Sequence, residues 1–93
     1  LEMEKKVYNC YNHSRIATSL NDIGNVYENM GDNQKALENY QQAYEIQKVV
    51  FIGEKNLTDI AITLSNMGNI YEKNSDFQKA LKFYEEALAI EYE

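Results

Sequence analysis

The sequence of 93 residues predicts an all-α fold built from tandem helical hairpins. The chain repeats itself with a period of 44 residues, and apolar residues inside each copy recur at steps of three and four. Such steps place side chains on one face of a helix. Proline is absent and glycine occurs four times, whereas a loop-rich or sandwich fold needs more of both for its turns. Apolar–polar alternation typical of strands is sustained nowhere.

The internal repeat is the strongest signal in the sequence. Residues 16–48 align without a gap on residues 60–92, and 15 of these 33 positions are identical. A fixed period of this length indicates two copies of one structural unit. The identical positions of the first copy are Ile16, Ala17, Leu20, Gly24, Asn25, Tyr27, Glu28, Asp32, Gln34, Lys35, Ala36, Leu37, Tyr40, Ala43 and Ile46.

Four main helices follow in order, over residues 14–30, 33–52, 58–73 and 76–92. Ser14 and Thr58 are predicted to cap the first helix of each copy by accepting from free backbone N–H groups. Residues 75–78 read Ser-Asp-Phe-Gln, which predicts a capping box at the start of the last helix.

Two glycines are predicted to end helices. Gly31 suits the left-handed conformation that closes a helix, and Asp32 then starts the next helix, where its charge meets the helix dipole favourably. Gly53 is expected to end the second helix before a loop over residues 54–57. Each copy is thus a helix–turn–helix hairpin.

The small residues of each copy have regular spacing. The first copy reads Leu20-x2-Ile23-Gly24-x2-Tyr27 and then Ala36-x3-Tyr40-x2-Ala43, and the second copy repeats this order 44 residues later. Gly24 and Ala36 are placed where the two helices of a hairpin approach most closely. The pattern resembles the tetratricopeptide repeat. Its period of 44 exceeds the usual 34, which resembles the long-repeat variety found in kinesin light chains and in the repeat proteins that orient mitotic spindles.

The resemblance implies helix-turn-helix repeats stacked as an α-solenoid, a right-handed superhelix that binds proteins. We expect residues 1–12 to be the remnant of a preceding repeat and its loop, 13–55 to be repeat one, and 56–93 to be repeat two. Since such repeats contact only their neighbours and generally need about three for stability, we expect the chain to be part of a longer array.

The charge balance excludes several classes of partner. Fifteen acidic residues against nine basic ones give a net charge of −6, and Arg15 is the single arginine. Nucleic-acid binding rests on clustered Lys and Arg, so it is not expected. The longest apolar run, Val49–Ile52, is far shorter than the roughly 20 residues that span a bilayer, which argues against membrane insertion. One cysteine fits a reducing compartment, and we expect a cytoplasmic (intracellular) protein.

Catalytic and cofactor chemistry find little support. Cys10 and His13 are three residues apart, but a metal site needs three or four ligands. A nucleophilic pair also needs an orienting partner and an oxyanion site. We therefore expect neither an enzyme nor a metal or cofactor site.

The resemblance implies that the first helices of successive repeats line a concave groove. Asn25 and Asn69 are the leading candidates there, because an amide offers both a donor and an acceptor to the backbone of an extended peptide. An equally weighted explanation is that these asparagines recur by ancestry alone. The predicted peptide-binding groove residues are Thr18, Asn21, Asn25, Glu28, Ile62, Ser65, Asn69 and Glu72.

The expected partner is a protein or a peptide segment of one. A terminal carboxylate is disfavoured as the ligand, because the groove face lacks cations and carries Asp22 and Glu28. The chain is then an interaction scaffold that binds a peptide in its groove. The alternative is an architectural subunit, or spacer, within a larger complex.

Overall fold

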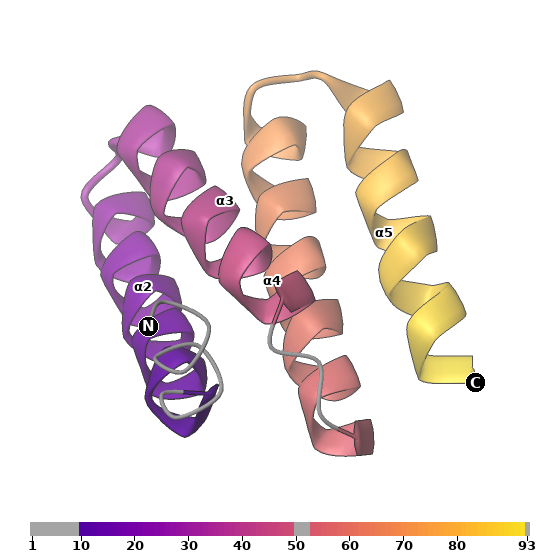
Figure 1. The fold of residues 1–93 in the computed structure, drawn as a ribbon. Helices are drawn as coiled ribbons and strands as arrows, with labels where there is room; N and C mark the ends of the chain where they lie inside the picture. Colours follow the sequence, from indigo (N-terminus) through magenta and orange to yellow (C-terminus); the bar gives the residue numbers. More distant parts are fainter. Residues whose placement is uncertain (1–9, 50–52, 93) are drawn as a thin grey trace.

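The computed structural model describes residues 10–49 and 53–92, and it contains four helices over this part of the chain. They are α2 (Cys10–Asn29), α3 (Asn33–Val49), α4 (Gly53–Lys73) and α5 (Phe77–Tyr92). Figure 1 shows two hairpins, α2 with α3 and α4 with α5, that meet where α3 packs against α4. The described residues form no strand, which confirms the all-α fold of tandem helical hairpins.

The first helix of each copy begins earlier than the sequence predicted. Ser14 and Thr58 lie inside α2 and α4, so the prediction that they cap these helices is wrong. Gly53 is the first residue of α4 rather than the end of the preceding helix, and the predicted loop over 54–57 is helical. Leu57 explains the extension, because it is partly buried and lies one helical turn before Ile60, in line with the apolar face.

The turn between α2 and α3 has the predicted chemistry. Gly31 has a φ of +88°. The N–H of Asp32 donates to the carbonyl of Tyr27 at 2.9 Å, and the N–H of Gly31 donates to that of Glu28 at 3.0 Å. This pair of bonds is the Schellman motif, which satisfies the last carbonyls of a helix. Asp32 Oδ1 then accepts from the Lys35 N–H at 3.1 Å and caps α3.

The second turn repeats the first with a serine in place of the glycine. Ser75 has a φ of +67°, and the Asp76 N–H donates to the Tyr71 carbonyl at 2.8 Å. Asp76 Oδ1 faces the Lys79 N–H at 3.4 Å. The predicted capping box is therefore wrong: Asp76 caps α5, and Ser75 occupies the left-handed position that ends α4.

The core lies mainly at the junction of α3 with α4. Within each hairpin, the two helices also approach each other closely at a glycine. A Cβ built on Gly24 would lie 2.6 Å from Cε1 of Tyr40, and a Cβ built on Gly68 would lie 2.7 Å from Cε1 of Tyr84. Each glycine thus makes room for the tyrosine ring of its own hairpin, whereas the spacing had placed Tyr40 in the wider space beside the close approach of Gly24 and Ala36. The buried cluster consists of Ala36, Tyr40, Ile60, Ala61, Leu64, Met67, Ile70 and Ala87.

Some expectations concern parts of the chain outside this description. The preceding-repeat remnant falls largely on residues 1–9, which lie outside the described residues. The division of the chain at 12/13 and 55/56 remains a prediction. Within the described residues, no helix combines the length and the apolar character needed to cross a bilayer.

Candidate functional site

A small depression lies between the first helices of the two copies and has a volume of about 160 Å³. It unites four of the eight predicted groove residues, namely Thr18, Asn21 and Asn25 from α2 and Ile62 from α4. We call this site the α2–α4 depression. Its lining residues are Thr18, Asn21, Asp22, Asn25, Gln47, Asp59, Ile62 and Asn66.

The other four predicted residues do not line this depression. Glu28 lies further along α2, where its carboxylate is held by two partners. Asn69 and Glu72 of α4 both contact the Tyr84 hydroxyl, at 2.5 and 2.9 Å. Ser65 is half-buried on α4. A groove needs the facing sides of two neighbouring first helices, so α2 and α4 cannot contribute equivalent residues to the same groove.

In each hairpin, a tyrosine hydroxyl contacts the asparagine that the sequence singled out. The Tyr40 hydroxyl lies 2.5 Å from Asn25 Oδ1 and 2.8 Å from Glu28 Oε1. Since a phenol carries one proton, it donates to one of these acceptors at a time. The structure gives the Nδ2 group of Asn25 no hydrogen bond within the described residues, and Asn25 is one of the residues that line the depression. Asn25 is thus positioned by the fold while keeping donors for a ligand.

The same contacts shift the acidity of the tyrosines. Burial, followed by the hydrogen bond and charge of Glu28, raises the pKa of Tyr40 well above its ordinary value. Desolvation, followed by the hydrogen bond and charge of Glu72, raises the pKa of Tyr84 to about 12. Both hydroxyls are therefore neutral donors at physiological pH.

Polar side chains join the two copies at the floor of the site. Asn21 Nδ2 donates to Thr63 Oγ1 at 2.8 Å, and this buried hydroxyl donates to Gln47 Oε1, also at 2.8 Å. Asn21 Oδ1 is buried and has no hydrogen-bond partner among the described residues. At the far end of α2, Lys73 Nζ lies 2.8 Å from Glu28 Oε2. These contacts fix the separation of α2 and α4, and with it the width of the depression.

The depression has an acidic lining. Asp22 and Asp59 are the charged residues among those that line it, and neither Lys nor Arg accompanies them. A cationic group entering the site gains Coulomb energy from both carboxylates, and an anionic group is repelled. The arrangement can hold a polar or basic segment, and it offers no nucleophile–base pair.

A second depression, which the sequence did not single out, lies beside α3 and α5 and has a volume of about 360 Å³. The rings of Tyr71 and Phe83 stack there with centroids 5.3 Å apart, and Lys79 Nζ lies 5.4 Å from the Tyr71 centroid. The signal in the sequence was Phe83, which replaces Asn39 of the first copy. Its lining residues are Gln41, Tyr44, Tyr71, Lys79, Lys82, Phe83 and Glu86.

The described residues contain no group of three or more His, Cys, Asp or Glu side chains arranged to hold a metal ion. The side chains of Cys10 and His13 lie outside the described set. The expectation of a chain without metal or cofactor remains a prediction.

Comparison with known proteins agrees with the repeat geometry. No curated protein matches the chain. The family model of the tetratricopeptide repeat matches residues 15–91, which cover all of α3 and α4 and most of α2 and α5. Repeats of this family generally mediate contacts between proteins. Because this match covers most of the sequence and both of its hairpins contribute to it, the chain belongs to the tetratricopeptide repeat family.

Proposed function

We propose that this chain is a non-catalytic interaction scaffold that binds a peptide segment of a partner along the α2–α4 depression. The observation that carries the proposal is the meeting of Thr18, Asn21 and Asn25 with Ile62 across two first helices. Polar groups from both copies converge there on one open site, while the residues that hold the helices together lie beneath it.

The size of the depression sets how a segment would bind. Its volume of about 160 Å³ is below the roughly 300–1,000 Å³ of small-molecule pockets. It would take one side chain, while the rest of an extended segment lies along α2 and α4. Ile62, with half of its surface exposed, offers an apolar contact, and the Nδ2 donors of Asn25 offer hydrogen bonds to peptide carbonyls.

The lining charges specify the segment further. Asp22 and Asp59 favour a partner segment whose inserted side chain is a lysine or an arginine, and they disfavour an acidic segment. We therefore propose a neutral or basic partner segment. Its affinity should fall with added salt, because part of the attraction is screened.

We also assign the chain to the long-repeat, kinesin light chain-like variety of the family. The support is the period of 44 residues together with the lengths of the first helices, which are 20 residues for α2 and 21 for α4. The extra length of the repeat lies partly at the start of α4, where the sequence had predicted a loop.

A second function is favoured by the two ends of the molecule. Both α2 and α5 carry large apolar side chains that are about half exposed, among them Val26 and Leu88. These faces support an architectural role, in which the chain is a spacer that binds neighbours through its ends. The two functions use different surfaces and are compatible in one molecule.

The groove proposal is tested with a displayed library of random peptides selected against the whole chain. We then measure how tightly the selected peptides bind two variants of the chain. Ile62→Arg is the test variant, because it places a bulky cation in the depression. Gln42→Arg is the control, because it adds the same charge at an exposed position on α3. We expect enrichment of Lys or Arg, at least tenfold weaker binding to Ile62→Arg, and unchanged binding to Gln42→Arg. Peptides that bind all three proteins equally would contradict the proposal.

A further inference from the structure

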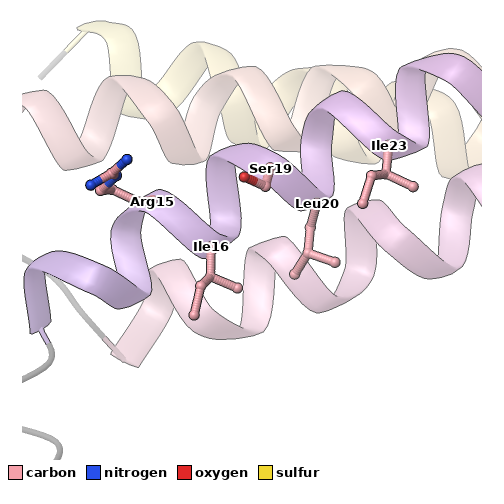
Figure 2. Close-up of a pocket in the computed structure, with 5 residues that line it drawn as sticks. All are labelled: Arg15, Ile16, Ser19, Leu20 and Ile23. Atoms are coloured by element: carbon pink, nitrogen blue, oxygen red, sulfur yellow. The ribbon is translucent and has the colours of Figure 1, made fainter.

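A shallow apolar depression on α2 is accounted for by the repeat architecture. Figure 2 shows Ile16, Leu20 and Ile23 extending into it from the same side of this helix. The residues at two of these repeat positions in α4, Ile60 and Met67, are buried where α3 packs against α4. A neighbouring repeat would cover this side of α2 in the same way, so its apolar side chains require no separate ligand.

The depression beside α3 and α5 is different, because both of its walls belong to this chain. From α3 it takes Gln41 and Tyr44, whose counterparts in α5 are Glu85 and Leu88. From α5 it takes residues at other repeat positions, among them Lys82. The facing sides of the two helices therefore line it, and a further repeat packed on the Leu88 side of α5 would leave it open. We call it the α3–α5 depression.

Aromatic rings form the apolar part of the α3–α5 depression. The rings of Tyr71 and Phe83 stack with their centroids 5.3 Å apart and their planes 8° from parallel. These rings and that of Tyr44 are partly buried, and Tyr44 and Phe83 pack against the core. The fold thus holds an apolar surface ready for a side chain, with little ordering left for binding to do. The volume of about 360 Å³ lies within the roughly 300–1,000 Å³ of ligand pockets.

Two lysines border these rings without being neutralised. Lys79 and Lys82 are exposed and three residues apart on α5, so they lie on the same side of the helix. Lys79 Nζ lies 5.4 Å from the centroid of the Tyr71 ring. Neither lysine forms a salt bridge within the described residues, although Glu86 lines the same depression. A chain with a net charge of −6 thus presents two unpaired ammonium groups beside an aromatic surface.

The hairpin fold alone does not account for this combination of residues. The positions of Lys82 and Phe83 are occupied in the first copy by Glu38 and Asn39. The second copy therefore has a cation and an aromatic ring where the first has an acidic and a polar side chain. Both copies nevertheless form the same helix–turn–helix hairpin.

We propose that the α3–α5 depression binds a phosphorylated segment of a partner protein. The ammonium groups of Lys79 and Lys82 bind the phosphoryl oxygens, and the aromatic rings contact an apolar side chain beside the phosphorylated residue. A phosphoryl group carries a charge of about −1.5 to −2 at pH 7 and three acceptor oxygens, which matches two ammonium groups. A carboxylate matches them less well, because it has a single charge. Glu86, which is already in the depression, draws neither lysine into a salt bridge.

This site does not rest on peptide binding at the α2–α4 depression. The two depressions share no lining residue, and they favour opposite charges. Displayed random peptides carry no phosphoryl group, so the selection against the α2–α4 depression and the test of the α3–α5 depression are separate measurements. Failure of one therefore leaves the other unaffected.

The probe is a synthetic library of peptides that have a fixed phosphoserine and randomised flanking residues, and it is selected against the whole chain. A recovered peptide is then titrated in three forms, with phosphoserine, serine or glutamate at the fixed position. We expect an apolar residue to be enriched beside the phosphoserine. The serine and glutamate forms should bind about tenfold more weakly or worse. A library that yields no phosphate-dependent peptide would overturn the proposal, and so would equal binding of the glutamate form.

Variants of the chain locate the binding site. Lys79→Gln and Lys82→Gln should each weaken binding of the phosphopeptide about tenfold, and Glu86→Gln should strengthen it, because a repelling carboxylate is removed. Lys35→Gln is the matched control, since Lys35 holds the repeat position of Lys79 and lies 5.5 Å from the centroid of Tyr27. It should bind like the unmodified chain, with the same helix content by circular dichroism. Equal losses in Lys35→Gln and Lys79→Gln would overturn the proposal, because they would indicate unspecific attraction by charge.

Discussion

Gly24 and Gly68 show how one residue sets the distance between the helices of a hairpin. Each faces a tyrosine ring at a distance that leaves no room for a Cβ. The two rings differ in freedom, because Tyr40 is fully buried and Tyr84 is only partly buried. The same substitution should therefore have different costs in the two copies.

Gly24→Ala should destabilise the chain, because the buried Tyr40 ring cannot move away from the added methyl group. Overpacking costs about 1–3 kcal/mol, which exceeds the gain of about 1 kcal/mol from replacing glycine by alanine in a helix. Gly68→Ala should be close to neutral, since Tyr84 can shift toward solvent. Urea unfolding of both variants provides the comparison, and equal losses would show that the ring contacts do not decide the outcome.

The tyrosine hydroxyls give the chain a dependence on alkaline pH. The pKa of Tyr84 is raised from its ordinary value of 10.0 to about 12, and that of Tyr40 is raised further. The folded state thus keeps protons that the unfolded chain loses, so stability is complete below pH 10 and falls as the pH rises through 12. We expect the free energy of unfolding to fall less steeply in Tyr40→Phe. An identical alkaline profile for Tyr40→Phe and the unmodified chain would contradict this assignment.

At the scale of single residues, the spacing predicted a close approach of the helices at Gly24, but it did not predict that the Tyr40 ring would lie directly against this glycine. It did not predict that the Tyr40 hydroxyl would engage Asn25 and Glu28. Periodicity places side chains on a face of a helix, but it does not tell which polar atoms meet across a hairpin. That is why Asn25 was expected only as a groove residue, whereas the fold also uses its Oδ1.

At the scale of the helices, Ser75 is the point where local and repeat signals disagree. The Ser-x-x-Gln order matched a capping box, but the repeat aligns Ser75 with Gly31, and the structure gives both a positive φ. The alignment was the better guide, because a turn conserved between the copies has the same backbone demands in both. Gly53 gave a wrong prediction for a similar reason. Glycine commonly ends a helix, but Leu57 extends the apolar face of α4 toward its N-terminus, and the helix begins at Gly53.

Ser75→Gly should stabilise the chain by about 0.5–1 kcal/mol, because the left-handed conformation strains a residue with a Cβ and glycine adopts it freely. Gly31→Ser is the reverse change and should lower stability by a similar amount. Beyond the adjoining residues, no atom lies within 4 Å of a Cβ built on Gly31, so the effect isolates the backbone. Urea unfolding with an unchanged m-value is the measurement. Opposite signs for the two variants support the account, and a destabilised Ser75→Gly would refute it.

At the scale of the whole molecule, the fold followed from the repeat, while the site followed only in part. Thr18, Asn21, Asn25 and Ile62 meet in one depression, but Glu28, Ser65, Asn69 and Glu72 lie outside it. The sequence treated the two copies as equivalent. However, a groove forms between two neighbouring helices, so α2 and α4 line it with the sides that face each other, and these sides share only some of their repeat positions. Asp59 and Gln47 also reach the site, and their contribution depends on how α3 packs against α4, which a pattern within one helix does not specify.

The central claim is that a partner segment binds along the α2–α4 depression. The most direct test is NMR chemical-shift mapping of the whole chain with a peptide selected from the library. We predict that the shifted amides cluster in residues 18–25 and 59–66, and that Asp22→Asn with Asp59→Asn weakens binding of a basic peptide. Shifts concentrated instead around Tyr44, Lys82 and Phe83, at the depression beside α3 and α5, would contradict the claim and move the binding site to that depression.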